Sequence, residues 1–193
     1  MERRTGIVLK MYKEKPHKMV ILDDKFGKIV GIFNRGTVHQ GALIGYGVTL
    51  QSHTLFLDTI ELLITPCAIA KHDIVFLHHL LELCYYLIPT GTCARDLLQF
   101  LIQLYATWQP DPTELFKKAV VFRLVAMLGI YAEGESSKPL LFHRLTTESI
   151  DTIVHTILDL GIEKRFTQWL HSCVAIHPHA KYFKTLSFYL RDE

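Results

Sequence analysis

The stretch Ile64-Thr65-Pro66-Cys67-Ala68 (ITPCA) marks the point at which the pattern of this 193-residue chain changes. Before it lie short segments rich in β-branched residues and separated by glycine, which is the pattern of strands. After it come longer stretches in which apolar residues recur at helical spacing. Because a proline can close a strand, we place a domain border between residues 65 and 66. The sequence therefore predicts an α+β chain, with a strand-rich domain over 1–65 and an all-helical domain over 66–193.

The strand-rich part resolves into separate segments of strand length and composition. They cover residues 5–12, 18–23, 28–34, 42–51 and 53–64. Asp23-Asp24-Lys25-Phe26-Gly27 predicts a hairpin turn, with Gly27 at positive φ. Gly41, Gly45 and Gly47 would let the next strand coil sharply. This arrangement matches an OB-fold, a five-stranded Greek-key barrel that often binds single-stranded nucleic acid. An SH3-like barrel or a plain β-meander would give a similar pattern.

Helix start and stop signals divide the second part. We expect helices over residues 68–87, 94–108, about 112–128, 146–161, 162–176 and 178–189. The clearest start is Asp111-Pro112-Thr113-Glu114, in which Asp111 suits the N-cap and Pro112 the first helical position. Gly129 would end that helix. Thr146 or Thr147 would begin the next one, which Gly161 ends, and residues 134–139 read as a polar loop.

Basic residues are concentrated at the start of the chain. Residues 1–40 hold nine Lys or Arg against four Asp or Glu, a net charge of +5, whereas the whole chain carries +2. Many weak cationic contacts of tolerant geometry can neutralise a polyanion, so this excess fits phosphate binding. The candidate DNA-binding residues are Lys10, Lys13, Lys18, Lys25, Lys28 and Arg35. Each of them taken singly reads more simply as a solvated lysine or arginine.

Two further sets of side chains have two interpretations each. Base stacking on the barrel would need exposed aromatic rings, and the barrel core would need buried ones. The candidates for either role are Tyr12, Phe26, Phe33 and Tyr46. Arg123 stands among apolar residues of the third expected helix, where it could be structural, as a snorkelling surface residue or in an ion pair, or could bind an anion.

The sequence offers no visible catalytic or metal-binding machinery. Eleven histidines are scattered, His78 and His79 would point to different helix faces, and no CxxC or HxxxH spacing occurs. A P-loop, a GxSxG motif and a carboxylate cluster of the kind a nuclease needs are also missing. We therefore expect a protein that is not an enzyme and has no cofactor. Four cysteines beside apolar helix patterns and the lack of a long apolar segment predict buried, reduced thiols and a cytoplasmic location.

Several short motifs in this order resemble the bacterial recombination mediator RecO family. They are Thr5-Gly6-Ile7-Val8-Leu9-Lys10, Lys28-Ile29-Val30, Arg35-Gly36, Phe122-Arg123-Leu124-Val125-Ala126-Met127-Leu128-Gly129 and Phe183-Lys184-Thr185-Leu186. The resemblance spans nearly the whole chain. It implies an N-terminal OB fold, a helical C-terminal domain, and a DNA repair protein of the bacterial nucleoid. Such proteins bind and anneal DNA strands, recognise the acidic tail of single-stranded DNA-binding protein, and work with RecR to load RecA.

By position, the resemblance assigns Lys10, Lys28 and Arg35 to DNA and Arg123 to the acidic tail, and we add Lys117 and Lys118 on the same helix as partner-binding residues. Two features depart from the family. Many members carry a four-cysteine zinc module after the Leu-Gly pair, and residues 129–146 contain no cysteine. Thr37-Val38-His39-Gln40 replaces a basic run. The leading hypothesis is a non-enzymatic DNA-repair mediator, and the alternative is a protein-interaction adaptor whose barrel binds no nucleic acid.

Overall fold

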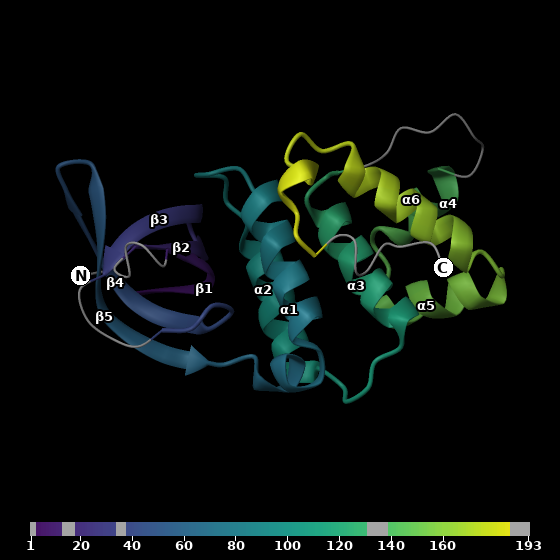
Figure 1. Ribbon diagram of the computed structural model, residues 1–193, viewed down its shortest axis with the longest axis horizontal. Coiled ribbons are helices and arrows are strands. Elements are labelled where there is room, and N and C mark those ends of the chain that lie inside the picture. Colours follow the sequence, from purple (N-terminus) through teal and green to yellow (C-terminus); the bar gives the residue numbers. More distant parts are fainter. Residues whose placement is uncertain (1–2, 13–17, 34–37, 131–138, 186–193) are drawn as a thin grey trace. The chain divides into compact units, whose positions relative to one another are not determined.

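The computed structural model describes residues 3–12, 18–33, 38–130 and 139–185. Its contacts divide the chain into two compact units, Met1–Pro110 and Asp111–Glu193. The change from strand to helix falls at Pro66, where we expected the domain border. The first compact unit nevertheless continues along the chain to residue 110. The first unit therefore contains the strands and also the first two helices (Figure 1).

The five strands of the first unit form a closed barrel. They are β1 (Arg3–Met11), β2 (Lys18–Asp23), β3 (Gly27–Phe33), β4 (Leu43–Gln51) and β5 (Thr54–Ile64). Their order around the barrel is β1-β2-β3-β5-β4, and β3 pairs with β5 in parallel while the other pairs are antiparallel. This order and the parallel closure confirm the OB-type Greek-key barrel and exclude a plain meander.

Alternation along the strands fills the barrel interior. The core consists of Val8, Met19, Ile21, Ile29, Phe33, Val38, Ala42, Ile44, Tyr46 and Leu57. Gly31 belongs to the same wall because a Cβ there would meet the Leu57 side chain at 2.6 Å. The hairpin turn is as predicted, since Gly27 has a φ of +66° and lies against the carbonyl of Thr92. The β4–β5 register shifts between Gly45 and Gly47, in the segment expected to coil.

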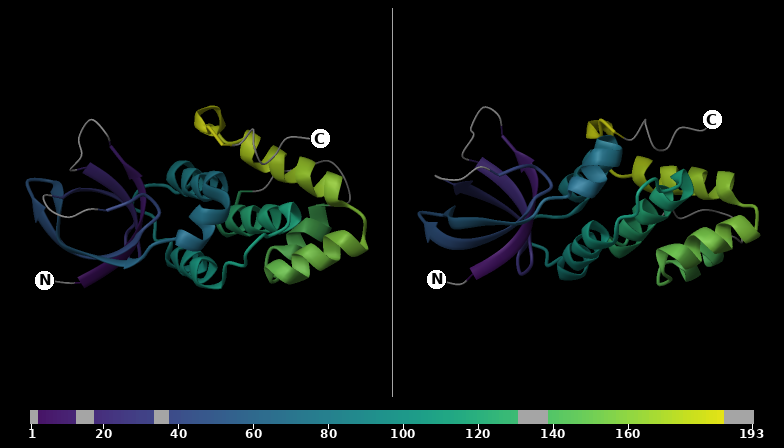
Figure 2. Two further views of the ribbon diagram at one scale, coloured as in Figure 1. Left: turned by 60° about the horizontal axis from the view of Figure 1, so that its bottom comes forward. Right: turned by 90° about the horizontal axis from the view of Figure 1, so that it is seen from below.

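Two helices complete the first unit and cover part of the barrel's outer surface. They are α1 (Cys67–Leu87), which contacts β1, and α2 (Arg95–Thr107), which contacts β2 (Figures 1 and 2). The outward-facing residues under them are Ile7, Leu9, Val20 and Leu22, each at most 2% exposed. Burial on both faces explains why β2 is apolar almost throughout instead of alternating with polar residues. Asp73 interrupts α1 with a non-helical backbone, and its carboxylate accepts a hydrogen bond from the Phe76 N–H at 2.8 Å.

The second unit is helical in its described residues. It contains α3 (Glu114–Met127), α4 (Pro139–Leu145), α5 (Ile150–Asp159), α6 (Glu163–Ala175) and a short 3-10 helix, η1 (Ala180–Tyr182). An aromatic cluster joins α3, α4 and α6, since Phe122 lies 5.4 Å from Phe166 and Phe142 lies 5.0 Å from Trp169, between ring centroids. Among the described residues, no helix combines the length and the apolar character needed to cross a membrane.

Several helix boundaries differ from the sequence expectation. The N-cap of α3 is Thr113, not Asp111, because the Thr113 hydroxyl accepts a hydrogen bond from the Phe116 N–H. The N-cap of α5 is Ser149, not Thr146 or Thr147, and α4 was not predicted. Of the helix expected over residues 178–189, the described part contains only η1. Gly129 and Gly161 follow α3 and α5 at positive φ, as expected of C-terminal glycines.

Candidate nucleic-acid interface

Three of the predicted DNA-binding lysines converge on two tyrosines. We call this group the Tyr12 cluster, and its members are Lys10, Tyr12, Lys18, Lys28 and Tyr85. The Lys10 ammonium lies 4.5 Å from the Tyr85 ring centroid and 5.4 Å from that of Tyr12. The Lys18 ammonium lies 5.1 Å from the Tyr12 centroid, and that of Lys28 lies 5.4 Å from the Tyr85 centroid. These distances are those of cation–π contacts, so the cluster joins positive charge to aromatic surface.

Strand register explains why these lysines gather. Lys10 pairs with Val20, and Lys28 pairs with Leu22, so both lysines project from the outer surface of the barrel beside apolar neighbours. A register shift in β1 between Val8 and Lys10 turns Lys10 outward. Tyr85 comes from the last turn of α1, which contacts β1. The cluster therefore needs both the barrel and α1, and the pattern within the strands could not indicate the tyrosine.

Lys28 has a structural role within the Tyr12 cluster. Its ammonium donates a hydrogen bond to the backbone carbonyl of Tyr85 at 2.6 Å. This carbonyl belongs to the last turn of α1, where unsatisfied carbonyls and the helix dipole attract a cation. Burial lowers the pKa of Lys28 from its usual value. Lys28 therefore links β3 to α1. Its ammonium already has a hydrogen-bond acceptor within the protein.

Tyr12 and Tyr85 are linked to each other. Their hydroxyl oxygens lie 3.4 Å apart, and both side chains are half-buried. The hydrogen bond to Tyr85 raises the pKa of Tyr12, and burial raises it further. Lys10 and Lys18 are likewise half-buried. Of the aromatic candidates, Phe33 and Tyr46 are barrel core, whereas Tyr12 and Phe26 keep accessible surface.

The remaining predicted DNA-binding residues lie elsewhere. Lys25 is exposed at the β2–β3 turn, 5.8 Å from the centroid of the Phe26 ring and outside the Tyr12 cluster. Lys13 and Arg35 lie outside the described residues. Tyr85 and Arg4 were not predicted as site residues, although Arg4 belongs to the basic excess of the first forty residues.

A second polar network, the Asp23 network, surrounds the β2–β3 turn. One carboxylate oxygen of Asp23 accepts hydrogen bonds from the N–H groups of Lys25 and Phe26, at 2.9 and 2.6 Å. The other accepts one from the Tyr46 hydroxyl and lies 3.7 Å from the Arg4 guanidinium. These contacts confirm that Asp23 belongs to the hairpin turn. Burial raises the pKa of Tyr46, and the hydrogen bond to Asp23 adds to this effect.

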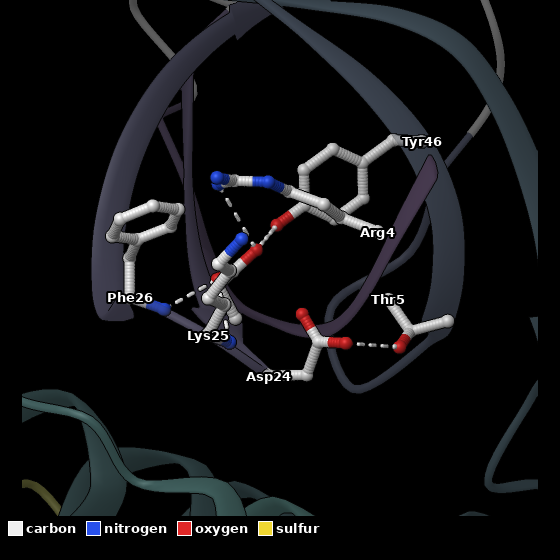
Figure 3. A network of polar contacts seen from close by, with 7 residues as sticks. Arg4, Thr5, Asp24, Lys25, Phe26 and Tyr46 are labelled. Atoms are coloured by element: carbon white, nitrogen blue, oxygen red, sulfur yellow. Dashed lines mark hydrogen bonds and ion pairs between the residues drawn. The ribbon is translucent and has the colours of Figure 1, made fainter. Parts of the chain in front are cut away.

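Arg4 connects this network to an exposed aromatic ring. Its guanidinium carbon lies 3.9 Å from the Phe26 ring centroid, and Figure 3 shows the two side chains against each other beside Tyr46. Asp24 is held separately, because its carboxylate accepts a hydrogen bond from the Thr5 hydroxyl at 3.2 Å. Two separate contacts thus join the turn to the first residues of β1, one between Asp23 and Arg4 and one between Asp24 and Thr5.

The outer surface of β2 is partly unavailable to a ligand. In OB folds the surface of the second and third strands commonly takes up oligonucleotides. In this barrel Val20 and Leu22 on that surface are buried, and α2 contacts β2. Val30 on β3 remains 39% exposed. The part of this surface around Val20 and Leu22 is therefore closed to a ligand.

The predicted partner-binding residues all lie on α3 in the second unit. Arg123 on α3 donates a hydrogen bond to the backbone carbonyl of Thr146, which is a structural contact but not an ion pair. Lys117 is buried and lies 2.7 Å from Glu114, while Lys118 is half-buried. A role for any of them in partner binding stays a prediction.

The described histidines and cysteines are spread over several elements of both units. Within the part of the chain that the structure describes, no group of three or more His, Cys, Asp or Glu side chains could hold a metal ion. His79 is buried and His78 exposed, in agreement with the expectation that they point to different helix faces. Cys84 and Cys173 are buried as predicted, but Cys67 and Cys93 are exposed, because they lie at the start of α1 and in the loop before α2.

Comparison with known proteins gives no further assignment. No protein-family model matches the chain, and no curated protein matches it.

Proposed function

We propose that this protein is a RecO-like DNA repair and recombination mediator, which binds and anneals single-stranded DNA through its barrel and is not an enzyme. The observation that carries the proposal is the gathering of Lys10 and Lys18 around the half-buried Tyr12 on an OB-type barrel. Ammonium groups can contact phosphates, and an accessible tyrosine can contact a base. Annealing needs only charge neutralisation that lets two polyanionic strands approach.

The wider role follows from the resemblance. The helical second unit would dock protein partners, namely the acidic C-terminal tail of single-stranded DNA-binding protein and RecR, so that RecA is loaded on the DNA. The protein would act in the bacterial cytoplasm, close to the nucleoid. Arg123, Lys117 and Lys118 remain the candidates for the acidic tail, although Arg123 also binds the Thr146 carbonyl.

The test is a DNA-binding titration of the full chain at two salt concentrations. We expect the wild-type protein to bind a fluorescent single-stranded oligonucleotide at about 50 mM salt and to lose affinity steeply towards 200 mM. Lys10→Glu with Lys18→Glu should weaken binding and reduce the slope of log K against log salt by at least about 1.4, the value for two lost phosphate contacts.

The matched control is Lys71→Glu, because Lys71 is an exposed lysine of α1 in the same unit. This variant should bind with nearly wild-type affinity and slope. Salt-independent binding, or no binding at low salt, would contradict the proposal. An annealing assay with two complementary labelled strands would then report whether binding leads to pairing.

A protein-interaction adaptor is the second candidate, and the burial of Val20 and Leu22 under helices favours it, because it removes part of the usual oligonucleotide surface. If the protein is an adaptor, reversing the charge of Lys10 and Lys18 leaves its cellular function unchanged. A DNA-repair phenotype of the Lys10→Glu, Lys18→Glu variant in cells would decide against the adaptor.

A further inference from the structure

The β2–β3 turn carries an exposed aromatic ring that the barrel core does not use. Phe26 is 42% exposed and does not belong to the core that the described residues of the barrel form. A large apolar side chain at a turn is ordinarily free to change rotamer, but this one has a cation stacked on one face. The Arg4 guanidinium carbon lies 3.9 Å from the ring centroid.

Arg4 is itself held in place. Its guanidinium lies 3.7 Å from the Asp23 carboxylate, which is fully buried and also accepts hydrogen bonds from Tyr46 and from two backbone N–H groups of the turn. The Asp23 network thus fixes the guanidinium, and the guanidinium fixes the ring, as the close-up in Figure 3 illustrates. An aromatic ring ordered in advance loses little conformational entropy when a ligand stacks on it.

Lys25 supplies exposed positive charge beside Phe26. Its ammonium lies 5.8 Å from the ring centroid, whereas the Arg4 guanidinium on the ring is paired with Asp23 and its side chain is only 11% exposed. A flat apolar ring beside cations is the combination that single-stranded DNA uses, with a base on the ring and phosphates near the charges. An acidic peptide would use the charges but would gain nothing specific from a flat ring.

We propose that Phe26, backed by Arg4 and flanked by Lys25, is a stacking platform for an unpaired base of single-stranded DNA. This inference rests on the proposed function and adds a second contact to it. Arg4 and Tyr12 are eight positions apart along β1 and the segment after it, which corresponds to about 25 Å of extended chain. One strand bound at both places would fall within the roughly 4–16 nucleotides that an OB fold covers.

The experiment compares two probes of about 20 nucleotides, a length above the site size of an OB fold. One is single-stranded oligothymidylate, and the other is an abasic phosphodiester of the same length. Phe26→Ala should lower the affinity for oligothymidylate roughly 5- to 100-fold and leave the salt slope unchanged, because a stacked base releases no counterions. On the abasic probe the wild type and Phe26→Ala should bind equally. Phe26→Tyr should bind oligothymidylate with nearly wild-type affinity, whereas Phe26→Leu should bind it more weakly. This pair still tests stacking if the alanine variant does not fold.

Ile74→Ala is the control, because Ile74 is an apolar residue of α1 that is 48% exposed. It should bind both probes as the wild type does. Equal binding of oligothymidylate by wild type, Phe26→Ala and Phe26→Leu would overturn the platform and leave the proposed function standing. A wild type that binds neither probe at low salt would overturn both proposals. A change of salt slope in Phe26→Ala would also contradict stacking, since it would indicate lost phosphate contacts.

Discussion

At the scale of the residue, Asp23 at the end of β2 contacts three other parts of the barrel. Its carboxylate is fully buried and contacts the β2–β3 turn through two N–H groups, β4 through Tyr46 and β1 through Arg4. A carboxylate can be buried without large cost only when donors surround it, and these donors do so. If the partners remain and the carboxylate is removed, the Arg4 charge and the turn N–H groups lose their acceptor.

Asp23→Ala should therefore destabilise the protein by about 3–5 kcal/mol, the range for a broken buried ion pair. Urea unfolding would measure this, with Trp108 of the first unit as the reporter in a Trp169→Phe background. Asp58→Ala is the matched control, because Asp58 is exposed and accepts a hydrogen bond from the Thr49 hydroxyl. Its cost should stay below about 1.5 kcal/mol. Equal losses of unfolding free energy in the two variants would show that the Asp23 network stabilises the fold no more than an exposed hydrogen bond does.

At the scale of the element, α1 contains a histidine that must stay neutral. His79 is fully buried, and burial lowers its pKa from 6.5 to about 4. The unfolded chain takes up the proton near pH 6.5, while the folded protein resists it until about pH 4. The unfolded state thus binds more protons in this interval, so stability is present above it and is lost as the pH falls through it.

We expect the first unit to lose roughly 3 kcal/mol between pH 7 and pH 4 through this residue, from a pKa difference of about 2.5. Urea unfolding at both pH values would show a smaller loss in His79→Leu than in the wild type. His78→Leu provides the control, since His78 is the exposed neighbour on α1, and it should behave like the wild type. The same pH dependence in all three proteins would refute the assignment to His79.

At the scale of the whole molecule, the barrel depends on the two helices that follow it. Ile7, Leu9, Val20 and Leu22 lie on the outside of the strands and are buried all the same, and α1 and α2 contact β1 and β2. A fragment of residues 1–65 would expose these side chains to water. A fragment of residues 1–110 would keep them covered, since it includes the whole first compact unit.

We expect the 1–110 fragment to be monomeric and to unfold cooperatively, and the 1–65 fragment to aggregate because of its exposed apolar surface. Size-exclusion chromatography and thermal unfolding by circular dichroism would compare them. A monomeric, cooperatively folding 1–65 fragment would contradict this expectation and support a domain border at Pro66.

Much of the fold could be predicted because it depends on local patterns. Strand segments, the turn at Gly27 and the glycines after α3 and α5 each follow from a residue type at a fixed place. The caps at Thr113 and Ser149 were assigned to neighbouring residues, because several side chains in each start signal can accept the same N–H hydrogen bond.

The candidate site was less predictable than the fold. Lys10, Lys18 and Lys28 were identified from charge alone, but their positions around Tyr12 depend on strand register. Tyr85 and the structural role of Lys28 could not be anticipated, since the hydrogen bond joins residues that are 57 positions apart. The interpretation of Phe26 and Tyr46 also depends on tertiary packing, which exposes Phe26 and buries Tyr46.

By itself, the sequence determined the five strands, the change at Pro66, most of the helices after it and the basic excess before it, because these depend on composition and on spacing along the chain. Only the tertiary structure decided which compact unit the first two helices join, which lysines meet, and that an exposed Phe26 rests on Arg4. The physical reason is that burial and charge contacts arise between residues far apart in the chain, and closure of the barrel brings them together.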